Sequence, residues 1–362
     1  MAARITRTLF RLQIMAKKKR KNKNAKSARV ESQKPHPRID NLELVKRFIA
    51  ERPDYERMCN EVAHILKTRL RQKNIESSGV TSRAKTLNSF LEKIDRKNYS
   101  DPLQNVTDIA GVRVVSLYVD DLAKIEKIIE TEFVIEEKVD KLSGKDVDQF
   151  GYGAIHFVVR LGGQNLGARY DDLKDLKCEI QTRTVLQDAW AIIQHHLVYK
   201  NESDVPRILQ RKLNGLAGLL ETADDQFQNL VNRRTSYVEA VRKATQDPVT
   251  FLETPINVDS LNEYLRWKFP DRHLHRNENI SSEVNSHLVE KRYQSLNDLE
   301  IALNKTESER EKVSESLGRT LSSMSELILA LGLTNPDFVK LPQMNRFRKL
   351  IEELSGGSKN AK

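Results

Sequence analysis

The sequence predicts an α+β fold in which helices flank a central mixed β-sheet, followed by a mostly α-helical C-terminal region. Two observations indicate this. Strand-like runs at 111–119, 154–161 and 176–183 are separated by stretches whose apolar residues recur at helical intervals, which is the pattern of a sheet covered by helices. From residue 207 onward the chain is rich in helix formers.

The N-terminal elements are predicted from apolar spacing. Residues 41–73 read as a helix with a break at Pro53, since a proline inside a helix removes a hydrogen bond. Residues 74–82 read as a loop or as an edge strand that enters a turn, and residues 86–97 as a further helix.

The middle of the chain alternates strands and helices. The strand 111–119 is followed by a predicted helix over 120–132, whose first residues are acidic and indicate a capped N-terminus. Residues 133–142 are a further candidate strand, and 184–200 read as a helix. The apolar side chains predicted on one face of this last helix are Leu186, Trp190, Ile193 and Leu197.

The C-terminal part is predicted to be helical with few apolar residues. One helix runs over 207–234, a break follows near Pro248 and Pro255, and a short amphipathic helix over 260–270 ends at Pro270. Beyond it the residues are nearly all helix formers, and their sparse apolar side chains favour a long or paired helix over a compact core.

Length and composition suit two domains with tails. The 362 residues contain two cysteines, too few for a disulfide framework, and no apolar run approaches the ~20 residues of a membrane helix. A reducing, cytoplasmic location without a membrane is the expectation. The predicted parts are a disordered basic tail over 1–40, a first domain over 41–235 and a helical region over 250–362.

The net charge of +10 is concentrated in the tail. The run 16–26 is basic and poor in apolar residues, so it either binds nucleic acid or is a solvated tail without a dedicated partner. The preceding acid-free segment is similar to an organellar presequence, but Met15, just before the lysines, favours a misassigned start.

A row of cations and a hydroxyl lies in 82–97. Lys85, Ser89 and Lys93 are spaced by four residues, so a helix aligns them on one face, with Arg83 just ahead. Several donors in a row suit a polyphosphate, whose charge is spread along its length. The alternative is a solvated basic helix face.

Carboxylates occur at two predicted strand starts. Asp108 precedes one strand, while Glu179, Gln181 and Arg183 alternate along another and therefore share one of its faces. If these strands are neighbours, Asp108 and Glu179 can hold Mg²⁺ against phosphates. The alternative is a helix cap or an ordinary ion pair.

Six motifs in order give the sequence its specific character. These are R-x-K-x3-S-x3-K at 83–93, DIAGVR at 108–113, GY-x2-IH at 151–156, EIQ-x-RT at 179–184, DAWAIIQHHLVYK at 188–200 and RKLNGLAGLLETADDQF at 211–227. Together they resemble the synthetase domain of the RelA/SpoT family, the alarmone pyrophosphokinases, over roughly residues 41–235.

The resemblance implies a nucleotidyltransferase-like synthetase fold and a reaction. This family moves the β,γ-pyrophosphate of ATP, with Mg²⁺, onto the 3′-hydroxyl of GTP or GDP and releases AMP. The resemblance implies ATP contacts for Arg83, Lys85, Ser89, Lys93 and Arg113, catalytic and metal-binding roles for Asp108 and Glu179, acceptor contacts for Tyr152 and His156, and a site-lining position for Gln181, Arg183 and His195.

Several positions depart from the family pattern. Asp148-Gln149-Phe150 stands where the family usually has a basic segment, and Ala154 where it often has arginine. Gln194 replaces a glutamate, and His196 a lysine. A less basic acceptor pocket favours the alternative of a toxic relative that modifies the 3′ end of tRNA and is restrained by its C-terminal region.

Three further expectations concern activity and partners. Only about 80 residues precede Arg83, and no His-Asp dipeptide occurs, so synthesis without hydrolysis is expected. A catalytically silent binding module is disfavoured because the residues that such a module would lose are all present: Arg83, Lys85, Ser89, Lys93, Asp108 and Glu179. The thinly apolar C-terminal helices suggest a homo-oligomer or a protein partner, since such helices need a partner surface.

Overall fold

The structure is a computed structural model that describes residues 41–97, 99–140, 153–197, 206–273 and 278–340, with 345, 347 and 348. The predicted basic tail, Met15, Asp148 and Tyr152 lie outside the described residues. The chain divides into two compact units. The sheet unit holds the described residues of 41–117, 123–140 and 153–183, and the helical unit holds 118–122, 184–197 and those from 206 onward.

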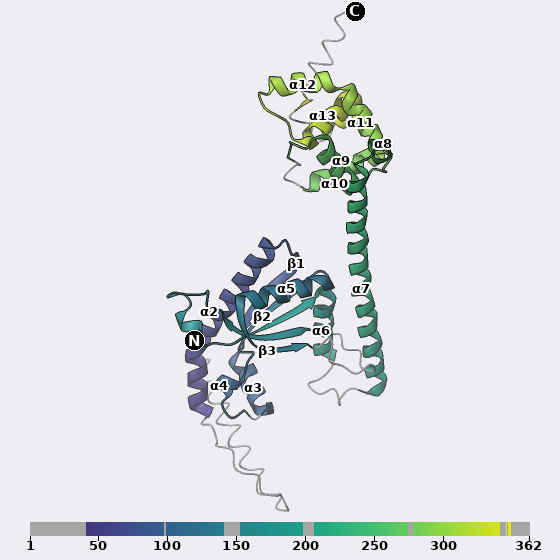
Figure 1. Cartoon of the computed structure of the whole chain (residues 1–362). Helices are drawn as coiled ribbons and strands as arrows, with labels where there is room; N and C mark the ends of the chain where they lie inside the picture. Colours follow the sequence, from purple (N-terminus) through teal and green to yellow (C-terminus); the bar gives the residue numbers. More distant parts are fainter. Residues whose placement is uncertain are drawn as a thin grey trace, which may run out of the picture. The chain divides into compact units, whose positions relative to one another are not determined.

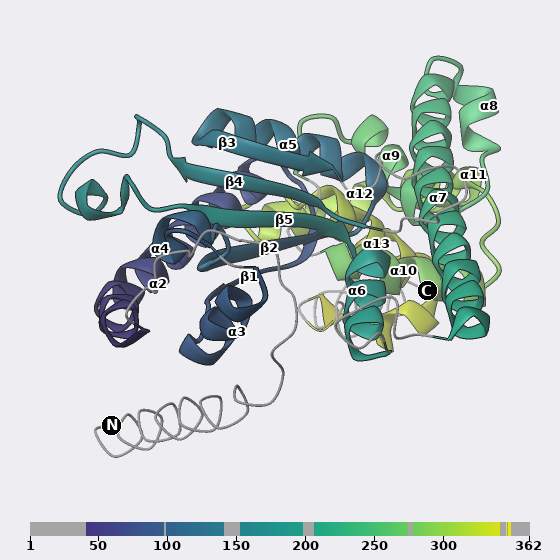
Figure 2. The ribbon, with the colours of Figure 1, turned by 90° about the horizontal axis from the view of Figure 1, so that it is seen from below.

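Five strands form one mixed sheet in the order β1-β2-β5-β4-β3 (Figure 2). Three of the strand pairs, β1 with β2, β3 with β4 and β4 with β5, are antiparallel. At the C-terminal ends of β2 and β5 the Ser116 hydroxyl donates to the Arg183 carbonyl at 3.3 Å, so these two neighbours run in the same direction. The strands are β1 Ser77–Ala84, β2 Ala110–Ser116, β3 Phe133–Asp140, β4 Ile155–Leu161 and β5 Cys178–Thr184.

One face of the sheet is buried under α2 and α5 (Figure 1). Met58, Val62 and Leu66 of α2 and Ile129 of α5 join every second residue of the strands in a single apolar core, as the two-residue period of a strand requires. The helices of this unit are α2 Asn41–Gln72, α3 Leu87–Lys97, α4 Pro102–Asn105, α5 Val119–Glu132 and the 3₁₀ turn Asp171–Leu173.

The predicted break at Pro53 is wrong, because α2 continues through it. Buried side chains on both sides, Phe48 and Tyr55, hold the helix against the core, and this packing outweighs the loss of one backbone donor. The predicted edge strand within 74–82 is confirmed as β1, and β3 confirms the candidate strand at 133–142.

The helical unit begins with two helices that pack on each other. Trp190 of α6 and Ala217 of α7 form a small buried cluster. The Thr184 side chain donates to the Asp224 carboxylate at 2.6 Å, and both residues are buried. Of the apolar face predicted for α6, Trp190 is buried, whereas Ile193 and Leu197 are 48% and 60% exposed.

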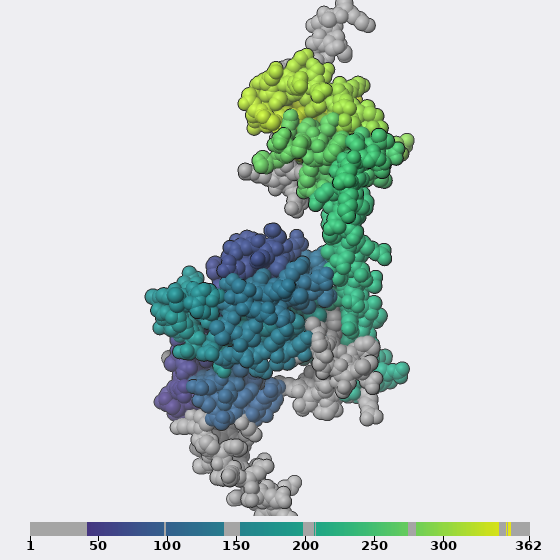
Figure 3. All heavy atoms as spheres, viewed as in Figure 1, coloured from purple at the N-terminus to yellow at the C-terminus, as the bar shows by residue number. Residues whose placement is uncertain are grey.

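The remaining helices surround a compact core, so the prediction of a long or paired helix without such a core is wrong. All residues from Ser323 to Gly332 of α13 are buried, which is the environment of a helix that is apolar all round. Figure 3 shows this part as a closely packed body. The elements are α6 Val185–Leu197, α7 Arg207–Ala244, α8 Pro248–Leu252, α9 Val258–Lys268, α10 Glu278–Glu290, α11 Leu296–Lys305, α12 Glu307–Ser316, α13 Ser323–Thr334 and the 3₁₀ helix Pro336–Lys340.

The core of the helical unit contains a charged group. Glu326 of α13 has a side chain only 3% exposed and forms ion pairs with Arg310 and Arg272. Arg310 also donates from Nη2 to the Leu303 carbonyl at 2.9 Å. Because the buried charges of Glu326 and Arg310 have partners, the desolvation cost of placing them in an apolar core is offset.

No helix in the described part of the chain is both long and apolar enough to cross a membrane.

Candidate active site on the polar face of the sheet

The face of the sheet opposite α2 and α5, here called the polar face, carries the predicted site residues. On β5 the residues Cys178 and Ile180 enter the core, so the residues between them point the other way. On the adjacent β4, His156 pairs with Gln181 in the antiparallel register and therefore shares that face. The predicted residues on the polar face are Arg83, Arg113, His156, Glu179, Gln181 and Arg183.

Two lysines converge on Asp108 just before β2. The Nζ atoms of Lys85 and Lys93 lie 2.9 Å and 2.8 Å from its two carboxylate oxygens. Burial by itself would raise the pKa of Asp108, but the hydrogen bonds and charges of Lys93 and Lys85 lower it below its usual value. Asp108 is therefore ionised at neutral pH, and the two lysines are its counter-charges.

The chain around Lys85 is fixed by contacts that the sequence did not reveal. The backbone N–H of Lys85 donates to the Ile109 carbonyl at 2.7 Å, and Arg52 of α2 donates to the Lys85 carbonyl at 3.2 Å. Helix α3 is anchored by Phe90, which stacks on Phe48 at 4.3 Å between ring centroids. Since α3 starts at Leu87, Lys85 lies before the helix rather than on its face, and this part of the predicted row is wrong.

His156 and Glu179 form the second polar pair. His156 Nδ1 lies 2.5 Å from Glu179 Oε1, and both side chains are less than one-fifth exposed, at 13% and 16%. Burial favours a higher pKa for Glu179, but the hydrogen bond and charge of His156 lower it below its usual value. Further along β5, Arg183 donates to the Gln181 side-chain oxygen at 2.8 Å. The strand thus presents a continuous polar row.

The two carboxylates lie near each other at the same end of neighbouring strands. The negative charge of Asp108 acts on Glu179 strongly enough to oppose the lowering of its pKa. Within the residues that the structure describes, no cluster of three or more His, Cys, Asp or Glu could hold a metal. Two carboxylates fit Mg²⁺, which takes one or two carboxylates together with substrate phosphates and water. Oδ1 of Asp108 is buried and faces the Lys93 ammonium group at 2.8 Å.

Other predicted residues take less direct positions. Ser89 is exposed on α3, where its hydroxyl accepts a hydrogen bond from Thr86 at 3.0 Å. Ala154 is buried. His195 belongs to α6 of the helical unit, where its ring lies edge-on to His196 with centroids 6.0 Å apart. Arg83 is exposed on β1.

Lysines next to paired carboxylates at the strand ends of a sheet are typical of an enzyme that binds and transfers groups from polyphosphates. Comparisons with known proteins agree with this class. Residues 82–204 match the family model described as "Region found in RelA / SpoT proteins". The chain is 27% identical over 154 residues to GTP pyrophosphokinase YjbM of Bacillus subtilis, an alignment that covers 42% of this chain and 70% of that protein. Its identity to GTP pyrophosphokinase YwaC of the same organism is 28% over 154 residues, with 40% and 70% covered.

A solved structure is also similar in part. The crystal structure of small alarmone synthetase 2 from Bacillus subtilis aligns with a TM-score of 0.45 at 23% identity, covering 51% of this chain and 98% of that one. The family match and the two relatives support a pyrophosphokinase activity for the part of the chain that is similar to RelA/SpoT proteins. The resemblance in the six sequence motifs is thereby confirmed.

Proposed function

We propose that this protein transfers the β,γ-pyrophosphate of ATP to the 3′-hydroxyl of GTP or GDP, releases AMP and has no hydrolase activity. The product is the alarmone (p)ppGpp. The observation that supports this most directly is the convergence of Lys85 and Lys93 on Asp108, beside Glu179. The names of the two relatives, both GTP pyrophosphokinases, point to the same acceptor.

ATP binding would exchange the partners of the two lysines. In the free chain their ammonium groups neutralise Asp108. A triphosphate offers them oxygens of higher charge, and charge-assisted hydrogen bonds of this kind are the strong ones. The exchange would leave the Asp108 carboxylate available to a cation. Arg83, Ser89 and Arg113 are the further ATP contacts in this proposal.

Mg²⁺ would be held by Asp108 and Glu179. A bound divalent cation neutralises the charge that develops on the transferring phosphates. Pyrophosphoryl transfer depends on positioning and charge neutralisation more than on covalent chemistry. Two carboxylates that hold the cation and two lysines that neutralise the phosphates would supply both.

Glu179 is also the proposed acceptor of the proton from the attacking hydroxyl. It is ionised at neutral pH because its pKa is lowered, and His156 holds its carboxylate from one side at 2.5 Å. An ionised carboxylate within hydrogen-bond reach of a hydroxyl can act as a general base. Tyr152 is proposed to stack on the acceptor base, while Gln181, Arg183 and His195 line the site.

The test offers the full chain ATP labelled at the γ-phosphate, Mg²⁺ and one acceptor at a time: GDP, GTP or deacylated tRNA. We expect label on GDP and GTP and release of AMP. Label on tRNA alone would replace the guanosine acceptor by the tRNA 3′ end, the alternative favoured by Ala154. Transfer to none of the three would refute the proposal. Incubation of the purified product with the enzyme checks the absence of hydrolysis.

The division into a synthetase domain over 41–235 and a regulatory or oligomerising region over 250–362 stays a prediction, as does a homo-oligomer or protein partner. Helix α7 continues from Arg207 to Ala244, so residue 235 falls inside it. Light scattering of the full chain measures the oligomeric state directly.

A further inference from the structure

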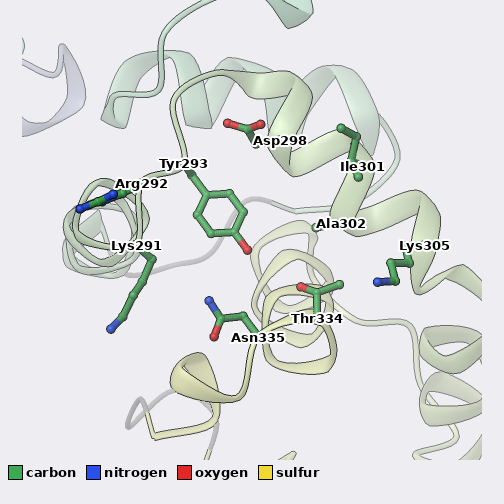
Figure 4. A pocket seen from close by; sticks show the side chains of 9 residues that line it. All are labelled: Lys291, Arg292, Tyr293, Asp298, Ile301, Ala302, Lys305, Thr334 and Asn335. Carbon is green, nitrogen blue, oxygen red and sulfur yellow. The ribbon is translucent and has the colours of Figure 1, made fainter.

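A pocket of about 400 Å³ lies in the helical unit, remote in sequence from the proposed active site. It is bounded by the turn after α10, by α11 and by the C-terminal end of α13 (Figure 4). The volume falls within the range of about 300–1,000 Å³ that is usual for small-molecule sites. Figure 4 shows the Tyr293 ring in the middle of this hollow, with its hydroxyl directed toward Thr334 and Asn335.

The pocket has more hydrogen-bond donors than its own structure uses. In the part of the chain that the structure describes, no hydrogen bond or ion pair is made by the Tyr293 hydroxyl, the Asn335 side-chain NH₂ or the Lys305 ammonium group. These three groups come from the α10–α11 turn, from the residue after α13 and from the end of α11. All three groups line the same pocket, which therefore has a surplus of donors.

One oxygen of the single carboxylate in the pocket wall, that of Asp298, already accepts hydrogen bonds from the protein. Asp298 Oδ2 accepts the backbone N–H groups of Gln294 at 2.7 Å and Ser295 at 3.1 Å, as part of the cap of α11. The other cation of the pocket wall near the turn, Lys291, forms an ion pair with Asp337 at 3.0 Å. Asp298 keeps its negative charge, but the nine lining residues include three cations, Lys291, Arg292 and Lys305, against this one carboxylate, so a negatively charged ligand is the complementary one.

The turn that places Tyr293 carries a backbone feature of its own. Arg292 has φ of +64°, the left-handed conformation in which glycine is usual at a helix C-terminus. The backbone N–H groups of Arg292 and Tyr293 donate to the carbonyls of Val289 at 3.1 Å and Leu288 at 3.0 Å. Non-glycine residues in this conformation concentrate at functional sites. The side chain of Arg292 is exposed and, in Figure 4, points away from the Tyr293 ring at the rim.

We propose that this pocket binds a small phosphomonoester, with the phosphate on Lys305, Asn335 and the Tyr293 hydroxyl. A phosphate monoester presents three acceptor oxygens and a charge of −1.5 to −2 (roughly, at neutral pH), which suits a pocket lined by three donors without a partner of their own among the described residues. The Tyr293 ring and the apolar Ile301 and Ala302 give a less polar wall for the carbon part of the ligand. Inorganic phosphate and an organic phosphate share the recognised group, and the test separates them.

The test is calorimetric titration of the full chain with ribose 5-phosphate, inorganic phosphate and ribose. We expect ribose 5-phosphate to bind, inorganic phosphate to bind more weakly and ribose not to bind. Lys305→Glu should weaken ribose 5-phosphate binding at least tenfold, since it replaces a cation by an anion. Lys312→Glu, a change at an exposed lysine of α12 outside the pocket, should leave the affinity unchanged.

Phosphates can also bind the proposed active site, so the titration is repeated with Lys85→Ala and Lys93→Ala combined. Retained binding in this double variant supports the pocket. Binding that disappears in the double variant but survives Lys305→Glu overturns the proposal, as does the absence of heat with both phosphates. Equal affinities for inorganic phosphate and ribose 5-phosphate would overturn the proposal that the carbon part of the ligand is recognised. Asn335→Asp serves as a second variant and should also weaken binding.

Discussion

The sheet unit and the helical unit both contain half-buried or buried ion pairs, but the pairs differ in whether a ligand can replace one of the partners. Asp108 and its two lysines keep between 16% and 24% of their side chains exposed. Glu326 and Arg310 of the helical unit keep only 3% and 9%. The first set borders solvent at strand ends, where a ligand can replace a partner. The second set lies between packed helices, where it cannot.

This difference separates two uses of the same chemistry. Charges that remain accessible can form a binding site, because a ligand of higher charge can replace one partner of the ion pair and attract the other more strongly. Charges that are fully desolvated fix the arrangement of the helices around them, and losing one partner leaves the other uncompensated. Three predictions test this distinction and a fourth tests the left-handed turn of the helical unit, in order of decreasing effect.

Replacing Asp108 by Asn should reduce pyrophosphate transfer by about 10³-fold, because it removes one of the two carboxylates proposed to hold the cation. The melting temperature should change little, since the site is partly exposed. Transfer of label from ATP and a thermal melt measure the two quantities. Asp95→Asn, at an exposed position of α3, is the matched control and should keep full activity. Unchanged transfer in the Asp108 variant would show that the metal site lies elsewhere.

Replacing Glu326 by Gln should lower the free energy of unfolding of the helical unit by about 3 kcal/mol, since the buried Arg310 then loses its counter-charge, as does the partly exposed Arg272. Denaturant unfolding measures the change. Glu307→Gln, at an exposed position of α12, should cost almost nothing. A loss of less than 1 kcal/mol (roughly the value of an exposed pair) would contradict the structural role of the buried group.

Replacing His156 by Ala should reduce transfer by about 10- to 100-fold and should alter its pH dependence. His156 lowers the pKa of Glu179, so its removal lets that pKa rise. Glu179 then becomes protonated at a higher pH, and the acidic limb of the rate profile moves upward in pH. Rates measured from acidic to neutral pH give the shift. His64→Ala, at an exposed position of α2, should leave the profile in place. A reduced rate without a shift would argue against the coupling.

Replacing Arg292 by Gly should stabilise the helical unit by about 1 kcal/mol, because glycine adopts the left-handed conformation without the Cβ clash. Arg292→Ala keeps the clash and removes only the charged part of the side chain, so its stability should stay near that of the parent. Unfolding free energies of the three proteins give the comparison. Equal stability of the Gly and Ala variants would mean that the turn is not strained.

Local sequence patterns were sufficient to predict which residues share the polar face, but they could not predict the long-range contacts that hold those residues in place. The alternation of Glu179, Gln181 and Arg183 in the sequence predicted their common face, since the period of a strand is fixed. By contrast, the contact from Arg52 to the Lys85 carbonyl joins residues 33 positions apart, and no local pattern encodes it. The pairing of His156 with Glu179 likewise depends on the register between β4 and β5.

The helical unit was the less predictable region for a different reason. A low average content of apolar residues suggested helices without a core, although the apolar run of α13 was visible at 327–331. Each surrounding helix needs only one apolar stripe when a single helix that is apolar all round fills the centre. Average composition therefore underestimated packing that is concentrated in one element. The ion pairs of Glu326 with Arg272 and Arg310 close only when distant helices meet.

Strand β5 also bears on how such a domain can evolve. Its core residues and its site residues occupy alternate positions, so a point mutation at an odd-numbered position can alter substrate chemistry while the core stays intact. An insertion or deletion of one residue would exchange the two sets and destroy both. Descendants of this chain can therefore change the chemistry of residues 179, 181 and 183 without losing the fold, but they cannot change the length of the strand between them.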